Sequence, residues 1–337
     1  MRVQVAEQQL TPTVISTFAG CGGSSLGYHL AGFKELLAVE WEDNAVATFR
    51  LNFPNVPVYH GDITKLSSAE CMRLAGIQKG QLDVFDGSPP CQGFSTAGNR
   101  KFDDPRNSLF KEYARLLEEM QPKVFVMENV TGMIKGHMKQ AYLQIIQTLR
   151  DCGYQAKGQV LNAMYYNVPQ SRQRVIIIGA RNDLGIQPSH PKPQSKPMTV
   201  RDAIADVHDT DAPPLPDWLK KACKEIIPGH WDGPYMMNIF KKYKGTSGGA
   251  LSTKLLAWDK YCCTLPKTEI AHSCIIHPDG ERRLSIQELS RLASFPDSFK
   301  FIDRPSSVER IGNSVPPNLM KAIALHIKEN ILLIPSA

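Results

Sequence analysis

The stretch Thr13-Val-Ile-Ser-Thr-Phe18-Ala-Gly-Cys-Gly-Gly-Ser-Ser-Leu-Gly27 decides the fold, because it joins a strand to a helix through a glycine-rich turn. Thr13–Phe18 is a short, mostly apolar run, which is typical of a buried strand. The glycines of the turn let the backbone approach a bound ligand closely, and the amides that open the helix can meet a carboxylate. The stretch therefore predicts a strand–turn–helix unit with a ligand at the turn.

The rest of the first half alternates further strands with helices. Four more strands are predicted, at Leu36–Glu40, Leu82–Asp86, Val124–Val130 and Arg174–Gly179. Helical spacing of apolar residues predicts one helix over 109–120, and a second is expected near Met138–Leu149. This alternation predicts an α/β fold, with a doubly wound, mostly parallel sheet that carries helices on both faces.

The pattern changes after Ala180. Prolines are dense from Pro188 to Pro234, which predicts a smaller, irregular second domain with few helices. Regularity returns in a short helix at Ser285–Leu292 and a longer one at Asn318–Leu333, whose apolar face is expected to pack against the first domain. We therefore divide the chain into residues 1–183, 184–268 and a return segment, 269–337, that completes the first domain.

Composition sets broad limits. The 337 residues are 42% hydrophobic and 21% charged, and the net charge of +6 permits a polyanionic partner without requiring one. Lys241, Lys242 and Lys244 form a basic cluster that on charge alone reads as a solvated face. The sequence contains no run of about 18 apolar residues, so no membrane-spanning helix is predicted. The polar start, Met1–Leu10, lacks the apolar segment of a secretory signal, so we expect a cytoplasmic protein.

The eight cysteines show no disulfide framework, so free thiols are expected. One cluster has residue types that could bind a metal ion: Cys262, Cys263, His272, Cys274 and His277. Its adjacent cysteines and irregular spacing do not match the usual paired zinc ligands. No metal site is predicted.

Acidic residues follow the glycine-rich turn at informative distances. Glu40 lies twenty residues past Gly20 at the end of a predicted strand, a spacing that suits a carboxylate holding ribose hydroxyls. Trp41 follows and can stack on an adenine, and Asp62 can accept from the adenine amine. The turn does not match G-x-G-x-x-G well, and alone it reads almost as readily as a structural turn. With Glu40 and Asp62 added, a nucleoside-containing cofactor is favoured.

A cysteine and three polar residues fall at strand ends of the predicted sheet. Cys91 follows a Pro-Pro pair beyond the strand Leu82–Asp86, where a lone cysteine is ordinarily a thiol in a proline turn. Ligands of open α/β sheets bind at such ends, and Glu128, Arg172 and Arg174 mark others. A thiolate, a carboxylate and arginines together suggest attack on an electron-poor ring, with the carboxylate at a ring nitrogen and an arginine at an exocyclic oxygen.

With these residues in place, the chain resembles the cytosine-5 DNA methyltransferase family from Phe18 to Leu319. The matching elements occur in the family's order. They are Phe18-Ala-Gly-Cys-Gly-Gly, Glu40-Trp41, Gly61-Asp62-Ile63, Gly87-Ser-Pro-Pro-Cys91-Gln-Gly-Phe-Ser95, Glu128-Asn129-Val130, Gln170-Ser-Arg172-Gln-Arg174, Arg282-Arg-Leu284-Ser-Ile-Gln-Glu288 and Gly312-Asn313-Ser314-Val315-Pro316-Pro317. The resemblance implies the S-adenosylmethionine-dependent methyltransferase fold, with residues 184–268 as a target-recognition domain.

The resemblance also implies roles for individual residues. Those around S-adenosylmethionine would be Phe18, Gly20, Cys21, Gly22, Gly23, Glu40, Trp41, Asp62, Ile63, Asn313 and Ser314. Cys91 would attack carbon 6 of a cytosine flipped out of duplex DNA, and Glu128 and Arg174 would hold the base with support from Arg172. The expected DNA contacts are Gln92, Ser95, Arg106, Lys241, Lys242 and Lys244.

Three other functions compete with this interpretation. A transfer-RNA branch of the same family shares the catalytic motifs, but this chain lacks the Cys-Phe-Thr element that we associate with that branch. A binding module that has lost catalysis would not need Cys91, Glu128 and Arg174, and neither would a nucleotide-dependent oxidoreductase. We therefore expect a monomeric DNA methyltransferase of a bacterial or phage-infected cell, with a restriction endonuclease as a possible functional partner.

Overall fold

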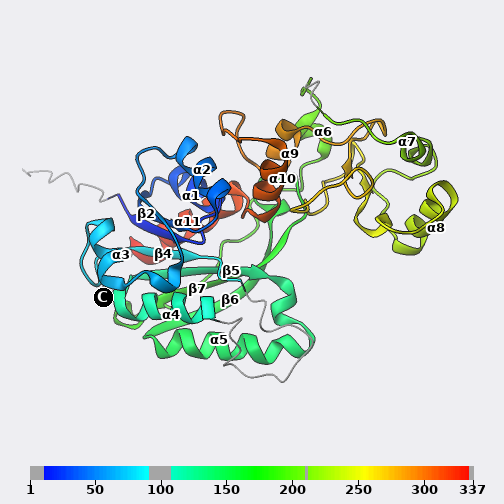
Figure 1. Cartoon of the computed structure of the whole chain (residues 1–337). Helices are drawn as coiled ribbons and strands as arrows, with labels where there is room; N and C mark the ends of the chain where they lie inside the picture. Colours follow the sequence, from blue (N-terminus) through cyan, green and yellow to red (C-terminus); the bar gives the residue numbers. More distant parts are fainter. Residues whose placement is uncertain (1–10, 91–107, 209–211, 334–337) are drawn as a thin grey trace, which may run out of the picture.

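The computed structural model describes residues 11–90, 108–208 and 212–333. Within them, seven strands form one sheet in the order β3-β2-β1-β4-β5-β7-β6 (Figure 1). The strands are β1 (Thr13–Thr17), β2 (Lys34–Glu40), β3 (Val58–His60), β4 (Val84–Gly87), β5 (Val124–Val130), β6 (Tyr154–Asn162) and β7 (Gln173–Arg181). The five predicted strands are present, and β3 and β6 were not predicted.

Strand direction explains how the polar residues meet. The first five strands of the order run parallel, whereas β7 is antiparallel to both β5 and β6. The mostly parallel sheet is therefore confirmed, and the β-branched run of β7 is interior as predicted. Because β7 is reversed, its first residues lie beside the last residues of β5, with Arg174 paired to Val130. Side chains at the start of β7 thus reach the carboxyl edge of the sheet.

Two hydrophobic clusters cover the two faces of the sheet. Successive strand residues alternate between them, as Val84 and Phe85 do on β4. The helices that pack on one face include α3 (Ser68–Ala75), α4 (Ser108–Met120) and α5 (Lys139–Asp151), and those on the other include α1 (Gly23–Leu30) and α11 (Pro317–Ile327). Helix α2 (Asp43–Asn52) packs near the β2–β3 edge through Phe49. Helices on both faces confirm the doubly wound prediction.

The end of the chain returns to the first domain, as its apolar pattern predicted. Helix α11 lies against α1 so closely that a Cβ added at Gly27 would stand 2.5 Å from Met320 Cβ and 2.7 Å from Pro317 O. Any side chain at Gly27 would therefore separate the two helices. The α-helix ends at Ile327, and a π-helical turn, Lys328–Leu332, completes the predicted helix.

The region beyond β7 contains two further cores. One joins α6 (Val200–Ile204), α9 (Ile286–Leu292) and α10 (Arg304–Asn313). The other joins α7 (Asp217–Cys223), α8 (Gly233–Lys244) and the two-stranded pair β8 (Lys254–Leu255) and β9 (Ile275–Ile276). In Figure 1, α7 and α8 lie at the end of the molecule away from the large sheet. The proline-rich segment therefore contains short helices between its turns.

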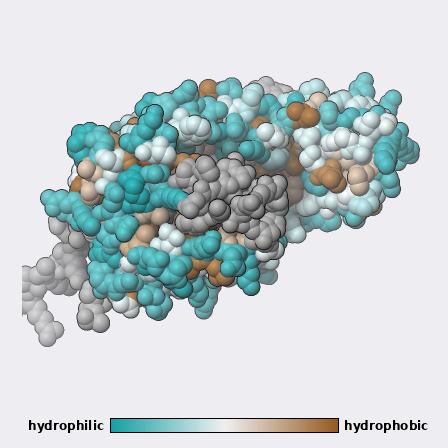
Figure 2. Space-filling view, turned by 60° about the horizontal axis from the view of Figure 1, so that its bottom comes forward, coloured by the Kyte–Doolittle hydropathy of each residue, from teal (hydrophilic) through white to brown (hydrophobic). Residues whose placement is uncertain are grey.

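In the described part of the chain, no helix has the length and apolar character needed to cross a membrane. The face in Figure 2 is mainly hydrophilic, and its hydrophobic residues occur in small separate groups.

One buried histidine predicts a pH dependence of stability. His190 is 8% exposed, its Nε2 lies 2.8 Å from Ile176 O, and its Nδ1 has no partner. Burial lowers the pKa of His190 from 6.5 to about 4. The native state then binds fewer protons than the unfolded state between these values, so stability falls as pH drops through this window. Between pH 7.5 and 5, His190 should remove about 2 kcal/mol from the free energy of unfolding.

Urea titrations at the two pH values check this prediction, with His190→Gln as the comparison. Glutamine does not titrate, so the variant should lose less stability on acidification than the parent protein. An equal loss in both proteins would rule out His190 as the source.

Candidate active site

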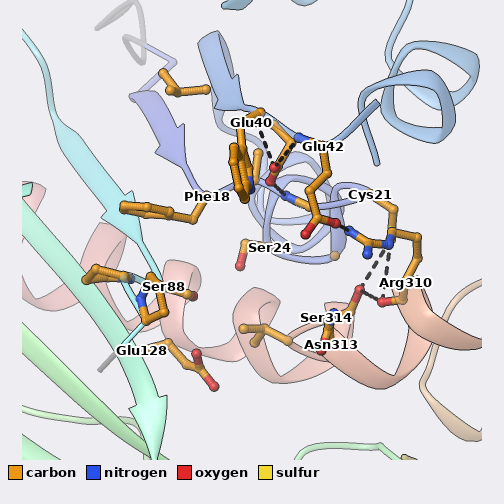
Figure 3. Close-up of a pocket in the computed structure, with 18 of the residues that line it drawn as sticks. Phe18, Cys21, Ser24, Glu40, Glu42, Ser88, Glu128, Arg310, Asn313 and Ser314 are labelled. Carbon is orange, nitrogen blue, oxygen red and sulfur yellow. Dashed lines mark hydrogen bonds and ion pairs between the residues drawn. The ribbon is translucent and has the colours of Figure 1, made fainter. Parts of the chain in front are cut away.

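A cavity of about 900 Å³ opens at the carboxyl edge of the sheet (Figure 3). Its walls come from the ends of β1, β2, β4 and β5, the start of β7, and the junction between α10 and α11. The lining includes these predicted residues: Phe18, Gly20, Cys21, Gly23, Glu40, Trp41, Asp62, Ile63, Glu128, Arg172, Arg174, Asn313 and Ser314. Predicted residues up to 296 positions apart in the sequence, Phe18 and Ser314, thus meet at one site.

Gly22 differs from its neighbours because it does not belong to this lining. It adopts a left-handed conformation with φ 98°, and an added Cβ would stand 2.4 Å from the ring of Phe53. Gly23 does line the cavity, and its added Cβ would stand 2.5 Å from Val315 O. Glycine is therefore needed at 22 for packing on the α2 side and at 23 for the approach of the C-terminal segment.

The Glu40 carboxylate fixes the shape of the cavity. Its Oε2 accepts from Gly20 N at 2.8 Å, and its Oε1 accepts from Trp41 N at 2.8 Å and Glu42 N at 3.0 Å. The carboxylate thereby links the glycine-rich turn to the end of β2. Glu40 is only 8% exposed, so these hydrogen bonds are mostly shielded from solvent. Because Oε2 accepts one of the three bonds, it retains capacity for a ligand hydroxyl.

The next wall has the features expected around an adenine. Trp41 is 69% exposed and lines the cavity, so its indole is available for stacking. Asp62 accepts from Thr64 N at 2.9 Å and starts the short turn that carries the buried Ile63. An aromatic face, a carboxylate and an apolar side chain suit a purine with an exocyclic amine.

The opposite wall comes from the far end of the chain. Ser314 Oγ donates to Arg310 O at 2.6 Å and lies 3.3 Å from Cys21 Sγ. Burial raises the pKa of the Cys21 thiol to about 11, so this cysteine is a neutral wall residue and a poor nucleophile.

A polar cluster in the same cavity consists of Glu128, Arg172 and Arg174. Arg174 Nε lies 2.7 Å from Glu128 Oε1, and both side chains are mostly buried. Arg172 is 3% exposed, its Nε makes no hydrogen bond, and a terminal nitrogen donates to Asn313 O at 3.3 Å. Burial, with Arg174 nearby, lowers the pKa of Arg172 to about 9. The cluster presents a carboxylate and N–H donors to a polar ring.

The polypeptide just before Arg172 is paired with Cys262, near the end of residues 184–268. Cys262 N donates to Pro169 O and Ser171 N donates to Cys262 O, both at 2.8 Å. The buried Gln170 side chain adds bonds to Leu265 N and Leu292 O, at 3.2 and 3.3 Å. These bonds join the region beyond β7 to the backbone that carries the two arginines.

Four predicted residues belong to a segment that the structure does not describe. Cys91, Gln92, Ser95 and Arg106 lie outside the described residues. The Asn129 amide donates to Pro89 O at 3.0 Å, which orients the Pro-Pro turn leading to position 91.

The lysine cluster occupies the last turn of α8, away from the cavity lining. Lys242 pairs with Glu225 at 2.6 Å, Lys244 donates to Gly248 O at 2.8 Å, and Lys241 is exposed. Cys262 and Cys274 are buried, and the described residues contain no group of His, Cys, Asp or Glu side chains arranged to hold a metal.

Sequence reasoning missed several residues of the lining, among them Glu42 and Arg310, whose side chains form an ion pair. Glu42 directly follows the Glu40-Trp41 element, and Arg310 precedes Gly312-Asn313. Their proximity to recognised elements was the available signal. Their pairing depends on the packing of α10, which no local pattern specifies.

Comparisons with known proteins agree with this geometry. Residues 12–329 match the family model described as C-5 cytosine-specific DNA methylase. The type II methyltransferase M.XorII of Xanthomonas oryzae is 33% identical over 93% of this chain and 83% of its own length. M.NgoPII of Neisseria gonorrhoeae is 32% identical over 94% and 96%. A crystal structure described as a prophage-encoded DNA modification methyltransferase of E. coli covers 96% of this chain and 100% of its own, with TM-score 0.74 and 26% identity.

Proposed function

The chain belongs to the C-5 cytosine-specific DNA methylase family, and from this premise we propose that it methylates carbon 5 of cytosine in duplex DNA with S-adenosylmethionine as donor. The observation that carries the proposal is the placement of the Glu128–Arg174 pair in the same cavity as Glu40 and Trp41. One part suits a nucleoside cofactor, and the adjoining part suits a polar ring.

The cofactor part fits S-adenosylmethionine by its chemistry. Glu40 retains acceptor capacity for ribose hydroxyls, Trp41 has a free face for the adenine, and Asp62 can accept from the adenine amine. The amides around Gly23 and the Ser314 hydroxyl border the opposite wall, where an amino-acid carboxylate can bind. When bound, the cofactor supplies an electrophilic methyl group on sulfur.

In the proposed reaction, the Cys91 thiolate adds to carbon 6 of the cytosine and forms a carbon–sulfur bond. The Glu128 carboxyl and ring nitrogen 3 share a proton in the adduct, and Arg174 binds the exocyclic oxygen. These contacts make carbon 6 electrophilic, and the electron pair of the C5–C6 double bond, displaced when sulfur bonds to carbon 6, makes carbon 5 nucleophilic. After methylation, loss of the carbon 5 proton drives expulsion of Cys91 and restores the ring double bond.

The buried setting of Glu128 and Arg174 requires the cytosine to leave the helix. A stacked base cannot bring carbon 6 to a nucleophile at the edge of this sheet, so the reaction includes base flipping. Arg172 supports the flipped base indirectly, because it joins the Arg174 segment to Asn313 on the cofactor wall.

We further propose that residues 184–268 recognise the DNA sequence, while 1–183 and 269–337 form the catalytic domain. The pairing of Cys262 with the segment before Arg172 supports this division of labour, since it links recognition to the base-binding arginines. The type II names of the relatives favour a role in restriction–modification, with a cognate endonuclease as functional partner.

The lysine cluster of α8 predicts a salt effect. If Lys241, Lys242 and Lys244 contact phosphates, changing all three to glutamine should flatten the dependence of log K on log salt by about 0.9 per lost contact. Filter binding of a DNA duplex between 50 and 200 mM salt measures the slope. Lys34→Gln is the control, because Lys34 starts β2 at the edge opposite the cavity. Equal slopes for the triple variant and the parent would remove these lysines from the interface.

The proposal is tested by cofactor binding and methyl transfer together. Calorimetry should show that S-adenosylmethionine binds and a nicotinamide dinucleotide does not. Transfer of a labelled methyl group should occur to duplex DNA and not to unmodified transfer RNA. Transfer to transfer RNA alone would assign the chain to another substrate, and binding of only the dinucleotide would exclude methyl transfer.

A further inference from the structure

An ion pair between Arg310 and Glu42 lies in the wall of the cavity and has no role in the chemistry described above. Arg310 on α10 is 4% exposed, and its guanidinium lies 2.5 Å from Glu42 Oε2. Figure 3 shows the two side chains pointing toward one another. Both residues line the cavity. The pair therefore joins the β2–α2 connection to the C-terminal return segment at the site itself.

The Glu42 end of the pair is coupled to the nucleoside-binding residues. Glu42 N donates to Glu40 Oε1 at 3.0 Å, and Trp41 lies between the two glutamates. Glu42 is also the residue that directly precedes α2, in extended conformation. A displacement of Glu42 therefore moves the carboxylate and the indole that face ribose and adenine.

The Arg310 end is coupled to the opposite wall through its backbone. Arg310 O accepts from Ser314 Oγ at 2.6 Å and from Cys21 Sγ at 3.9 Å. Arg310 thus contacts three segments: the glycine-rich turn, the β2–α2 connection and the α10–α11 junction. Since each segment forms one wall of the cavity, the orientation of this arginine sets their spacing.

We propose that the Glu42–Arg310 pair is a latch that positions the two walls of the cofactor site and thereby sets cofactor affinity. The inference rests on the proposed function, because it assigns a positioning role within that cofactor site. Neither residue reaches the Glu128–Arg174 cluster in the described contacts. The latch should therefore affect cofactor binding and leave the chemical step intact.

The chain offers a matched control for the latch. Arg310 also pairs with Glu309, at 2.9 Å, but Glu309 lies beside it on α10 and does not line the cavity. Loss of Glu309 removes one ion pair of the same arginine without separating the walls. An effect that arises only because Arg310 loses one ion pair should therefore appear in both Glu42→Gln and Glu309→Gln. An effect of the spacing between the walls should appear in Glu42→Gln alone.

The test measures the dissociation constant of S-adenosylmethionine by calorimetry, and KM and kcat in the methyl-transfer assay. Glu42→Gln should raise the dissociation constant and KM about tenfold, the effect of losing one charged hydrogen bond, with kcat at saturation within about twofold. Arg310→Met should show the same split, and Glu309→Gln should bind as the parent does. The reciprocal double change, E42R with R310E, should recover part of the affinity.

Three results would overturn the latch: unchanged affinity in Glu42→Gln, an equal loss in Glu309→Gln, or a fall in kcat without a rise in KM. Because Glu42 is partly exposed, Glu42→Gln tests the inference even where Arg310→Met fails to fold. Failure of the parent protein to bind S-adenosylmethionine would instead reject the proposed function, so the two failures are distinguishable.

Discussion

Replacing Glu128 with glutamine is expected to lower kcat by about 10²–10³-fold, because the amide cannot give a proton to ring nitrogen 3 of the cytosine. The isosteric side chain keeps its place beside Arg174, which it meets at 2.7 Å in the parent protein. Single-turnover rates with saturating cofactor and duplex DNA isolate the chemical step. Glutamine is chosen over alanine because its side-chain oxygen can still accept a hydrogen bond from the buried Arg174, which alanine would leave without this partner.

Glu128→Gln should leave cofactor binding and the fold unchanged. Cofactor affinity should match that of the parent, because Glu128 lies at the end of β5 and away from the residues expected to bind the nucleoside. Thermal unfolding checks that the fold is retained. A kcat within threefold of the parent would show that Glu128 has no part in activating the base.

The second large effect is expected for Cys91→Ala, which should abolish detectable methyl transfer. Alanine cannot form the bond to carbon 6, so carbon 5 stays unreactive toward the methyl donor. Binding of cofactor and DNA should persist, since neither depends on the thiol. Methyl-transfer assays, with DNA binding measured by mobility shift, separate the two expectations.

Cys263→Ala is the matched control for this variant. Cys263 is a partly exposed free thiol outside the cavity lining, so its loss should leave turnover intact. Turnover by Cys91→Ala at a measurable fraction of the parent rate would reject the covalent mechanism and leave methyl transfer to be explained without a nucleophile.

The fold was predictable where local patterns carried it. The apolar runs of β1, β2, β4, β5 and β7 are visible in the sequence because buried strands exclude polar residues. Strand β6 escaped notice because it is an edge strand whose exposed positions include Gln155, Lys157 and Gln159. The short β3 has only three residues, Val58–His60, and no distinctive pattern.

The site was predictable only in part, for a physical reason. Glu128, at the end of β5, can be placed at this edge from the α/β pattern alone. Arg174 starts its strand and reaches the same edge only because β7 is antiparallel. Gly22 packs against Phe53, a contact that the sequence did not predict, because glycine serves packing as readily as ligand approach. The Glu42–Arg310 pair joins segments far apart in the chain, and only tertiary packing brings them together.

The central claim is methylation of cytosine at carbon 5 in DNA, and nucleoside mass spectrometry tests it most directly. Unmethylated genomic DNA and unmodified transfer RNA would be incubated separately with the protein and S-adenosylmethionine carrying a deuterated methyl group, then digested to nucleosides. We predict labelled 5-methylcytosine in the DNA digest and none in the RNA digest. Label in RNA alone, or on another position or base of the DNA, would contradict the account.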